Sequence, residues 1–422
     1  MSAARDHALM AQALRLAEMG LCTTMPNPRV GCVIARGDDI VGTGWHERAG
    51  GPHAEILALR EAGEAARGAT AYVTLEPCGL HGRTPPCADA LIAAGIARVV
   101  IAADDAAQQG GGALERLRAA GIAVDAGLMR DAARELNRGF FARVERGRPW
   151  LRVKLAMSLD GRTALADGTS KWITGAAARA DVQHWRARSS AILTGSGTVL
   201  ADDPRLTVRL ESLSRAGHGF SSFPRTRESI GPDGRKSTMD ACPRGRDGQP
   251  GGSNPRHRCR ETGEGSVEAQ CDTTPVPPLR VVLDAALRTP RGAHVLDGSV
   301  PTLLLHAPDA RADDDRFTAV ERAALDRGAG GLDLGAALAL LAARGMNEVQ
   351  VEAGPTLCGA LFAAGFVDEL LLYVAPVLLG DTARPLLALP PLADMTARRS
   401  LRVHDERRVG DDWRLLLRPV QA

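Results

Sequence analysis

The chain has 422 residues, with 52 Lys and Arg against 50 Asp and Glu, and a net charge of +2 at pH 7. This length suggests two or three domains, and the balanced charge argues against a chain-wide basic surface for nucleic acid. Its eight cysteines lack the compact spacing of a secreted domain, there is no signal-peptide core, and no apolar run approaches a membrane span. We therefore expect a cytoplasmic protein that acts on a small molecule, with no membrane or nucleic-acid partner.

Predicted helices and strands alternate through residues 1–147. A helix is expected from about residue 6 to 20, because Leu9, Ala13 and Leu16 recur at helical spacing. Further strands are expected at 30–34, 40–45, 69–75, 97–102 and 122–126, and helices at 53–62, 87–94, 113–120 and 131–146. This alternation predicts an α/β domain built on one sheet, with residues 147–149 as the linker to the second half of the chain.

One histidine and two cysteines in this domain predict a metal site. His53 opens the second helix, Cys78 follows a strand, and Cys87 begins another helix. Imidazole and thiolate are the ligands that Zn²⁺ prefers, and three protein ligands leave a fourth position for water. Glu55 is close enough in sequence to exchange protons with that water, and this His-x-Glu and Pro-Cys arrangement is the signature of zinc deaminases.

A purely structural zinc site is the main alternative. Such a site normally closes with a fourth Cys or His, and His81 lies nearby in the sequence. A structural site, however, gives no reason for the neighbouring Glu55 or for the glycine-rich segment 79–83. We therefore expect a catalytic zinc site with ligands His53, Cys78 and Cys87, and Glu55 as the general acid and base.

A second α/β pattern begins after Trp150. Strands are expected at 151–157, 191–194, 279–284, 302–306, 348–352, 369–374 and 413–417, and helices at 175–188, 334–343 and 357–364. Residues 211–278 interrupt this pattern, because they are rich in Arg, Gly, Ser and Pro without a periodic apolar face. That composition is typical of a disordered insert.

Motifs in both halves resemble one known enzyme family. They are His53-Ala54-Glu55, Thr74-Leu75-Glu76-Pro77-Cys78, 82–87, 154–162, Ala201-Asp202-Asp203-Pro204 and 351–357. Together they resemble the bifunctional riboflavin-biosynthesis family, in which an aminopyrimidine deaminase is fused to an NADPH-dependent reductase. The resemblance implies an α/β fold: a cytidine-deaminase-like three-layer domain (1–147) followed by a dihydrofolate-reductase-like domain (150–422).

In the first domain, the resemblance implies hydrolytic deamination of a pyrimidine that carries a phosphoribosyl group. Asn27, in the rigid turn Pro26-Asn27-Pro28, and His46 fall where the family contacts the base. The amide of Asn27 offers both a donor and an acceptor to a pyrimidine edge. Two segments depart from the family pattern: Leu80 stands where a polar histidine is expected, and residues 104–109 replace an Asp-Pro-Asn-Pro loop.

In the second domain, the resemblance implies reduction of the ribosyl chain to ribityl, with NADPH as the hydride donor. A Gly-Pro-Thr turn after a strand suits a cofactor phosphate at a helix start. The implied cofactor-binding residues are Ala156, Trp172, Thr198, Asp202, Gly354, Pro355, Thr356, Leu357, Cys358, Gly359 and Ala360. The implied substrate-binding residues are Ser170, Arg186, Leu206, Arg209 and Glu352, and the two arginines suit the substrate phosphate.

Two other functions compete with this interpretation. A zinc deaminase for a nucleoside or a tRNA would not need the second domain. A non-catalytic fusion with a structural metal site could bind RNA through its Arg-rich insert, and a salt-sensitive RNA affinity would support it. Glu55 and the open metal position argue against the latter. The family resemblance also implies a homo-oligomer, expected as a dimer.

Overall fold

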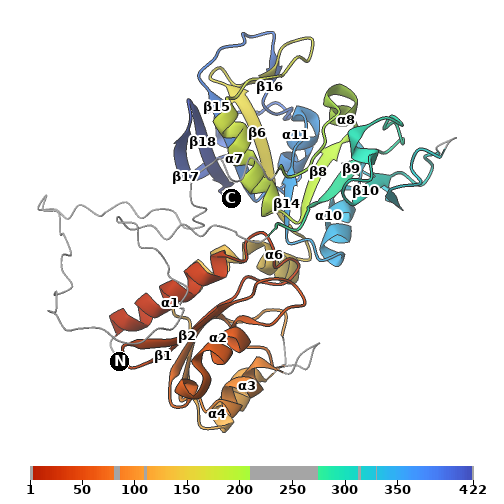
Figure 1. Ribbon diagram of the computed structural model, residues 1–422. Coiled ribbons are helices and arrows are strands. Elements are labelled where there is room, and N and C mark those ends of the chain that lie inside the picture. Colours follow the sequence, from red (N-terminus) through yellow and green to blue (C-terminus); the bar gives the residue numbers. More distant parts are fainter. Residues whose placement is uncertain are drawn as a thin grey trace, which may run out of the picture.

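The computed structural model describes residues 3–79, 86–108, 112–209, 274–311, 315–328 and 330–420. They form two α/β units, one built from the first 146 residues and one from residue 150 onward (Figure 1). Among these residues, no helix has both the length and the apolar character that crossing a membrane would require.

The first unit is a five-stranded mixed sheet. Its elements are α1 (Ala3–Glu18), β1 (Gly31–Arg36), β2 (Asp39–Trp45), α2 (Ala54–Ala62), β3 (Thr70–Leu75), α3 (Cys87–Ala93), β4 (Arg98–Ala103), α4 (Ala113–Ala119), β5 (Ala123–Ala126), α5 (Arg130–Leu136) and α6 (Arg138–Arg146). The strand order is β2-β1-β3-β4-β5. β1 is antiparallel to both of its neighbours, whereas β3, β4 and β5 run parallel.

Helices cover both faces of this sheet because buried side chains alternate along its strands. Val33 and Tyr72 pack with α1, α5 and α6, while Ile34 and Val73 pack with α2, α3 and α4. The three-layer arrangement expected for this unit is therefore confirmed.

The second unit is a nine-stranded sheet. Its elements are β6 (Trp150–Ser158), β7 (Arg162–Ala164), α7 (Ala176–Ala187), β8 (Ala191–Gly195), α8 (Ser196–Asp202), β9 (Leu279–Leu283), β10 (Thr302–His306), β11 (Glu321–Ala324), β12 (Arg327–Gly328), β13 (Gly331–Leu332), α10 (Leu334–Ala343), β14 (Glu348–Val351), α11 (Pro355–Ala363), β15 (Glu369–Ala375), β16 (Arg384–Pro385), β17 (Leu401–Val409) and β18 (Asp412–Pro419). The strand order is β11-β10-β9-β8-β14-β6-β15-β18-β17, and only β18 and β17 are antiparallel to their neighbours.

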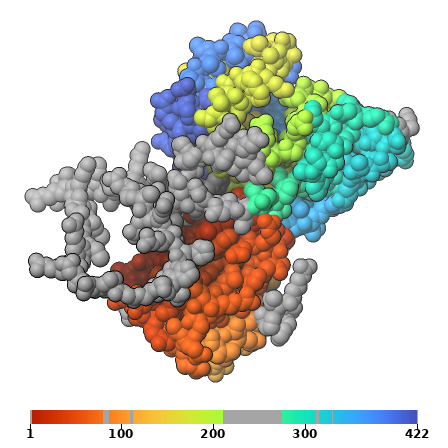
Figure 2. All heavy atoms as spheres, in the orientation of Figure 1, coloured from red at the N-terminus to blue at the C-terminus, as the bar shows by residue number. Residues whose placement is uncertain are grey.

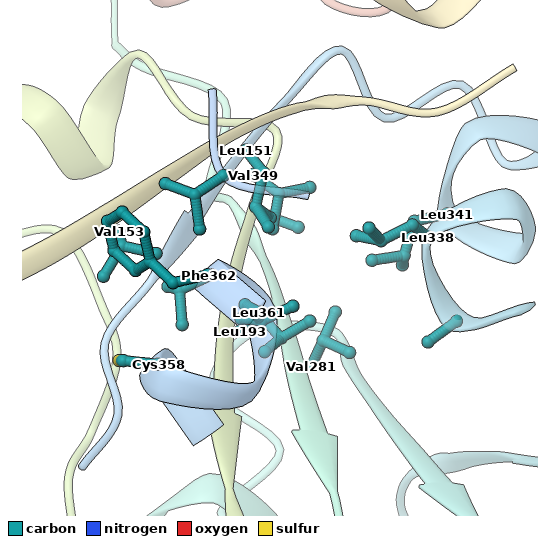
Figure 3. Close-up of a cluster of buried hydrophobic side chains, with 14 of the residues drawn as sticks. Leu151, Val153, Leu193, Val281, Leu338, Leu341, Val349, Cys358, Leu361 and Phe362 are labelled. Atoms are coloured by element: carbon teal, nitrogen blue, oxygen red, sulfur yellow. The ribbon is translucent and has the colours of Figure 1, made fainter. Parts of the chain in front are cut away.

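The largest hydrophobic core lies between this sheet and the helices α10 and α11. Figure 3 shows Leu338 and Leu341 at one side of the cluster, apart from Leu361 and Phe362, and strand residues such as Val349 belong to the same cluster. α7 covers the opposite face, where Trp185 packs with strand residues of β15 and β18. Because most strands of this sheet are parallel, their carboxyl ends lie at one edge of the sheet, the usual place for a ligand cleft.

Several elements differ from the sequence-based expectations. The single helix expected at 131–146 is two helices, because Asn137 is buried and its side chain bonds both the N–H and the carbonyl of Arg29 at 2.8 Å. Residues 196–202, for which no helix was expected, form α8. β17 was missed since Leu401–Val409 is rich in charges and its side chains are largely exposed at the sheet edge.

The disordered insert expected at 211–278 lies outside the described residues for 211–273. Its last residues are described, and they contact the first unit. The Val276 N–H donates to the carbonyl of Cys22 at 3.0 Å, and the Arg48 guanidinium donates to the carbonyl of Thr274 at 2.9 Å. Residues 274–278 are therefore part of the packed structure.

Buried charges join the two units, which lie against each other in Figure 2. Glu348 and Glu369, on neighbouring parts of the second sheet, have fully buried side chains. Glu348 pairs with Arg29 of the first unit at 2.9 Å and with Arg152 at 2.8 Å. Glu369 pairs with Arg152 and with Arg138 of α6. Removing one member of this network would be strongly destabilising, because a buried charge without its partner is costly.

Candidate active sites

Three elements of the first unit bring the predicted metal ligands together. His53 caps the start of α2, Cys78 follows β3, and Cys87 is the first residue of α3. His53 Nδ1 lies 3.2 Å from Cys87 Sγ and 3.6 Å from Cys78 Sγ. Their donor atoms all lie within 4.8 Å of one another. One imidazole and two thiols converging in this way match the donor set of a catalytic zinc ion.

The surroundings of the cysteines favour metal binding. A hydrogen bond from the Cys87 thiol, together with the His53 ring and the Cys87 N–H, lowers the pKa of Cys78 to about 4. Thiolate is the form that binds a metal. Among the described residues, no fourth His, Cys, Asp or Glu joins this group; His81, the alternative fourth ligand, lies outside them.

Glu55 lies on α2, two residues beyond His53, and only 3% of it is exposed. Burial raises the pKa of its carboxyl to about 7. α2 approaches β2 closely enough to bury this side chain because β2 has Gly42 and Gly44 at the contact. A Cβ atom at Gly44 would lie 2.3 Å from the Ala54 carbonyl oxygen, so a larger residue would push the helix start away.

Asn27 and His46 contact each other beside the metal ligands. Burial lowers the pKa of His46, so the neutral ring donates from Nδ1 to the Pro52 carbonyl at 3.0 Å. Its Nε2 then accepts from Asn27 Nδ2 at 3.1 Å, which leaves the amide oxygen of Asn27 available as an acceptor. The His46 ring also packs edge-on against His53, with 5.4 Å between centroids.

The segment that replaces the expected Asp-Pro-Asn-Pro loop supports the metal-binding segment. Gln108 Oε1 accepts from the Gly79 N–H at 2.8 Å, next to Cys78. Gln108 Nε2 donates to Asp105, whose N–H donates to Glu76. Leu80, the other departure, lies outside the described residues. The altered sequence thus contacts the metal-binding segment through the side-chain amide of Gln108, where the family pattern has an Asp-Pro-Asn-Pro loop.

A cleft of about 1240 Å³ opens at the carboxyl edge of the second sheet. Of the residues expected to bind the cofactor, Ala156, Trp172, Thr198, Asp202, Gly354, Pro355, Thr356, Leu357 and Ala360 line it. All the residues expected to bind the substrate also line it: Ser170, Arg186, Leu206, Arg209 and Glu352. The structure therefore brings residues from distant parts of the chain to a single cleft.

Cys358 and Gly359 do not line this cleft. The Cys358 side chain is fully buried in the core between α11 and the sheet (Figure 3). A Cβ at Gly359 would lie 2.2 Å from the Ala388 carbonyl oxygen, so this glycine permits close packing of α11 on a loop. Both were placed in the cofactor set because the whole helix start was assigned to the cofactor, whereas one face of a helix packs on the sheet.

Arg186 and Glu352 form a bidentate ion pair in the cleft wall, with both N–O distances at 2.7 Å. Although burial opposes ionisation, the Arg186 guanidinium lowers the pKa of Glu352 to about 2. A third group, Lys154, lines the same cleft, and burial lowers the pKa of its ammonium. Sequence reasoning did not select Lys154, although it opens one of the motifs that carry the family resemblance.

The backbone around Leu206 is unusual. Its φ is +49°, while its side chain is buried in a hydrophobic cluster. A non-glycine residue with positive φ is costly and is often found at binding sites. Nearby, the Gln183 side chain accepts from the Arg209 N–H at 3.0 Å. These contacts fix the loop that presents Arg209 at the cleft.

Comparisons with known proteins agree with this geometry. The cytidine and deoxycytidylate deaminase zinc-binding region matches residues 3–103, and the RibD C-terminal domain matches residues 149–413. The riboflavin biosynthesis protein RibD of Escherichia coli (strain K12) is 44% identical, over 97% of this chain and 98% of that protein.

Solved structures give the same result. A structure of Acinetobacter baumannii RibD is 37% identical and covers 99% of each chain with a TM-score of 0.78. A diaminohydroxyphosphoribosylaminopyrimidine deaminase/5-amino-6-(5-phosphoribosylamino)uracil reductase from Thermotoga maritima is 27% identical, covers 98% of this chain and 99% of that one, and has a TM-score of 0.74. These matches confirm the expected fold class, with a cytidine-deaminase-like domain followed by a dihydrofolate-reductase-like domain.

Proposed function

Because this chain belongs to the family of the riboflavin biosynthesis protein RibD, a bifunctional deaminase and reductase, we propose how its residues divide the two reactions. Residues 1–147 form the zinc-dependent deaminase domain and residues 150–422 the NADPH-dependent reductase domain. The substrate of the first is 2,5-diamino-6-(5-phosphoribosylamino)pyrimidin-4-one, and the second reduces the ribosyl chain of the deaminated product to ribityl. The observation that carries this proposal is the convergence of His53, Cys78 and Cys87 beside a buried Glu55.

In the deaminase domain, His53, Cys78 and Cys87 hold the metal. Zinc, when bound, makes a water molecule acidic enough to react near neutral pH. The Glu55 carboxylate would accept one proton from this water and deliver it to the ring nitrogen, and would then move a second proton, from the hydroxyl group added to the ring carbon, to the departing amino group so that ammonia leaves. Asn27 accepts a hydrogen bond from the pyrimidine through its amide oxygen, and His46 holds that amide in place.

In the reductase domain, NADPH supplies the hydride when bound. The start of α11, at Gly354, carries N–H groups without a side-chain cap, and these suit the cofactor phosphates. Arg209, exposed at the cleft, binds the phosphate of the substrate. Arg186 keeps Glu352 ionised and still has two N–H groups for that phosphate, since three of its five are used within the protein. Lys154, which lines the same cleft, gives a proton to the ribose oxygen that receives negative charge.

We propose a homodimer in the cytoplasm, as the family resemblance implies, and the exposed edge of the second sheet supports the dimer. Val403 of the edge strand β17 is 52% exposed, and Trp413 of the neighbouring β18 is 48% exposed; an edge strand can pair with another chain, although the charges of β17 limit the partners that fit it. Light scattering should give twice the mass of one chain. A mass equal to one chain at working concentration would contradict the dimer without affecting the two activities.

One experiment tests the proposed function. Purified protein is supplied with the diaminopyrimidine substrate, and ammonia release and NADPH oxidation are followed separately. We expect ammonia release without NADPH, and NADPH oxidation only after deamination has begun or when deaminated substrate is added. Ammonia release that is insensitive to chelation of zinc, or NADPH oxidation with undeaminated substrate alone, would contradict the proposed order and sites.

A further inference from the structure

The turn that carries Asn27 in the deaminase domain rests on the reductase domain. Asn347 precedes β14 and is 4% exposed. Its Nδ2 donates to the carbonyl oxygen of Pro26 at 2.9 Å, and its Oδ1 accepts from Arg143 Nε at 2.7 Å. The amide of a reductase-domain residue therefore holds the peptide unit that leads directly into Asn27.

Other reductase-domain groups support the same turn. Ser190 donates its hydroxyl to Met25 and accepts from the Asn347 N–H at 3.0 Å. Gly345 has φ +80°, and a Cβ there would lie 3.1 Å from the Pro26 ring. Glu348 binds the guanidinium of Arg29 at 2.9 Å, so the turn is fixed to the reductase domain on both sides of Asn27.

The position of the Pro26 carbonyl affects the position of Asn27 because the turn between them is stiff. Pro26 and Pro28 flank Asn27, and each proline fixes its own φ. Fewer backbone rotations are therefore available to absorb a displacement of the Pro26 carbonyl before it reaches Asn27. The side chain of Asn27 is held in addition by its hydrogen bond to His46.

We propose that Asn347 is a positioning residue for deamination: its amide holds the Pro26 carbonyl and so aims the Asn27 side chain at the pyrimidine. This inference rests on the proposed contact between Asn27 and the base. Asn347 and the reductase cleft lie at opposite ends of β14, since Glu352 follows that strand. At about 3.3 Å per residue, five residues of extended chain separate them by roughly 16 Å. A change at Asn347 can therefore alter one activity without the other.

The test uses the full-length zinc-loaded protein with Asn347→Asp. This change keeps an acceptor for Arg143 but removes the donor to Pro26. We expect the deaminase kcat/KM to fall roughly ten-fold, mainly through KM, as for a lost hydrogen bond with one oxygen left unpaired. Zinc content and the reductase kcat/KM on preformed deaminated substrate should stay within about two-fold of wild type, which is below the effect of one hydrogen bond.

Arg146→Met is the matched control, because it removes an inter-domain ion pair with Asp368 (2.8 Å) away from the turn. Its deaminase kcat/KM should be unchanged. Asn347→Ala, which adds no buried charge, should lower deaminase kcat/KM in the same direction if Asn347→Asp does not fold. Loss of both activities together in the Asn347 variants, or an equal deaminase loss in Arg146→Met, would overturn the inference.

Asn27→Ala separates this inference from the proposed function. If Asn347 acts through Asn27, then Asn347→Asp should add no further loss in an Asn27→Ala background. Losses that multiply in the double variant would overturn the positioning role. An Asn27→Ala variant with wild-type deamination would instead refute the proposed contact with the base, whereas a defective Asn27→Ala beside a fully active Asn347→Asp would refute only the inference.

Discussion

Glu55→Gln is the sharpest test of the deaminase chemistry. Glu55 is 3% exposed and is not one of the three metal ligands. Glutamine has nearly the same volume, so the packing of α2 on β2 and the convergence of His53, Cys78 and Cys87 should be preserved. Only the capacity to accept and return a proton is lost. General acid–base catalysis contributes about 10²–10⁴-fold, which corresponds to roughly 2.7–5.5 kcal/mol in the activation barrier.

Ammonia release measures this loss, metal analysis measures bound zinc, and NADPH oxidation with deaminated substrate measures the reductase. We expect deamination to fall at least about 100-fold while zinc content and reductase activity stay at wild-type values. Glu61→Gln is the matched control, because Glu61 lies on the same helix, away from the metal ligands, and accepts from Thr43. A fall in zinc content that accounts for the whole loss, with full activity per bound zinc, would refute the role of Glu55.

Four further predictions concern the reductase site, the insert and acid stability. Gly354→Asp should raise the KM for NADPH strongly, because the added charge repels the phosphate, and should leave ammonia release unchanged. A new Cβ at Gly354 meets nothing within 4 Å, so the effect is one of charge and not of packing. The neutral Gly354→Asn should have a smaller effect, and an unchanged KM in Gly354→Asp would contradict the assignment. Arg209→Ala should weaken binding of the phosphoribosyl substrate by roughly 1.5–3 kcal/mol and leave the KM for NADPH unchanged. The reverse pattern in steady-state kinetics would exchange the two assignments. Replacing residues 211–272 by a short Gly/Ser linker should leave both activities near wild type, whereas removing 211–278 should impair deamination because the Thr274 and Val276 contacts are lost; equal activities of the two deletions would refute this distinction. Although burial opposes ionisation, the Arg138, Arg152 and Arg418 charges hold the pKa of Glu369 at about 2, below its usual 4.5. The contribution of Glu369 to the free energy of unfolding is therefore complete above about pH 4.5 and is lost as the pH falls toward 2. The Tm of wild type should fall more steeply over this range than that of Glu369→Gln, and parallel curves would contradict the prediction.

The metal site could be predicted from the sequence because its chemistry depends on residue type and short spacings. His53 and Glu55 lie at the start of one helix, and Cys78 and Cys87 are nine residues apart, so the ligand set could be recognised from residue types and short spacings, whereas its convergence depends on how α2, α3 and the end of β3 pack together. Family motifs likewise identified the residues that line the reductase cleft. The motif did not separate Ala360, which lines the cleft, from Cys358, which is buried, because that distinction depends on which face of α11 packs on the sheet.

Contacts between residues far apart in the chain were decided only by the tertiary structure. The pairing of Arg186 with Glu352 spans 166 residues, and the contact between Asn347 and Pro26 spans 321. No local pattern predicts either contact, because the first depends on how α7 packs beside β14 within the second unit and the second depends on how the two units pack together. The break at Asn137 has the same origin, since its side chain bonds the backbone of Arg29 and a helical period cannot reveal that partner. Local chemistry thus determined where zinc binds, and packing between the domains decided which groups hold Asn27 beside it.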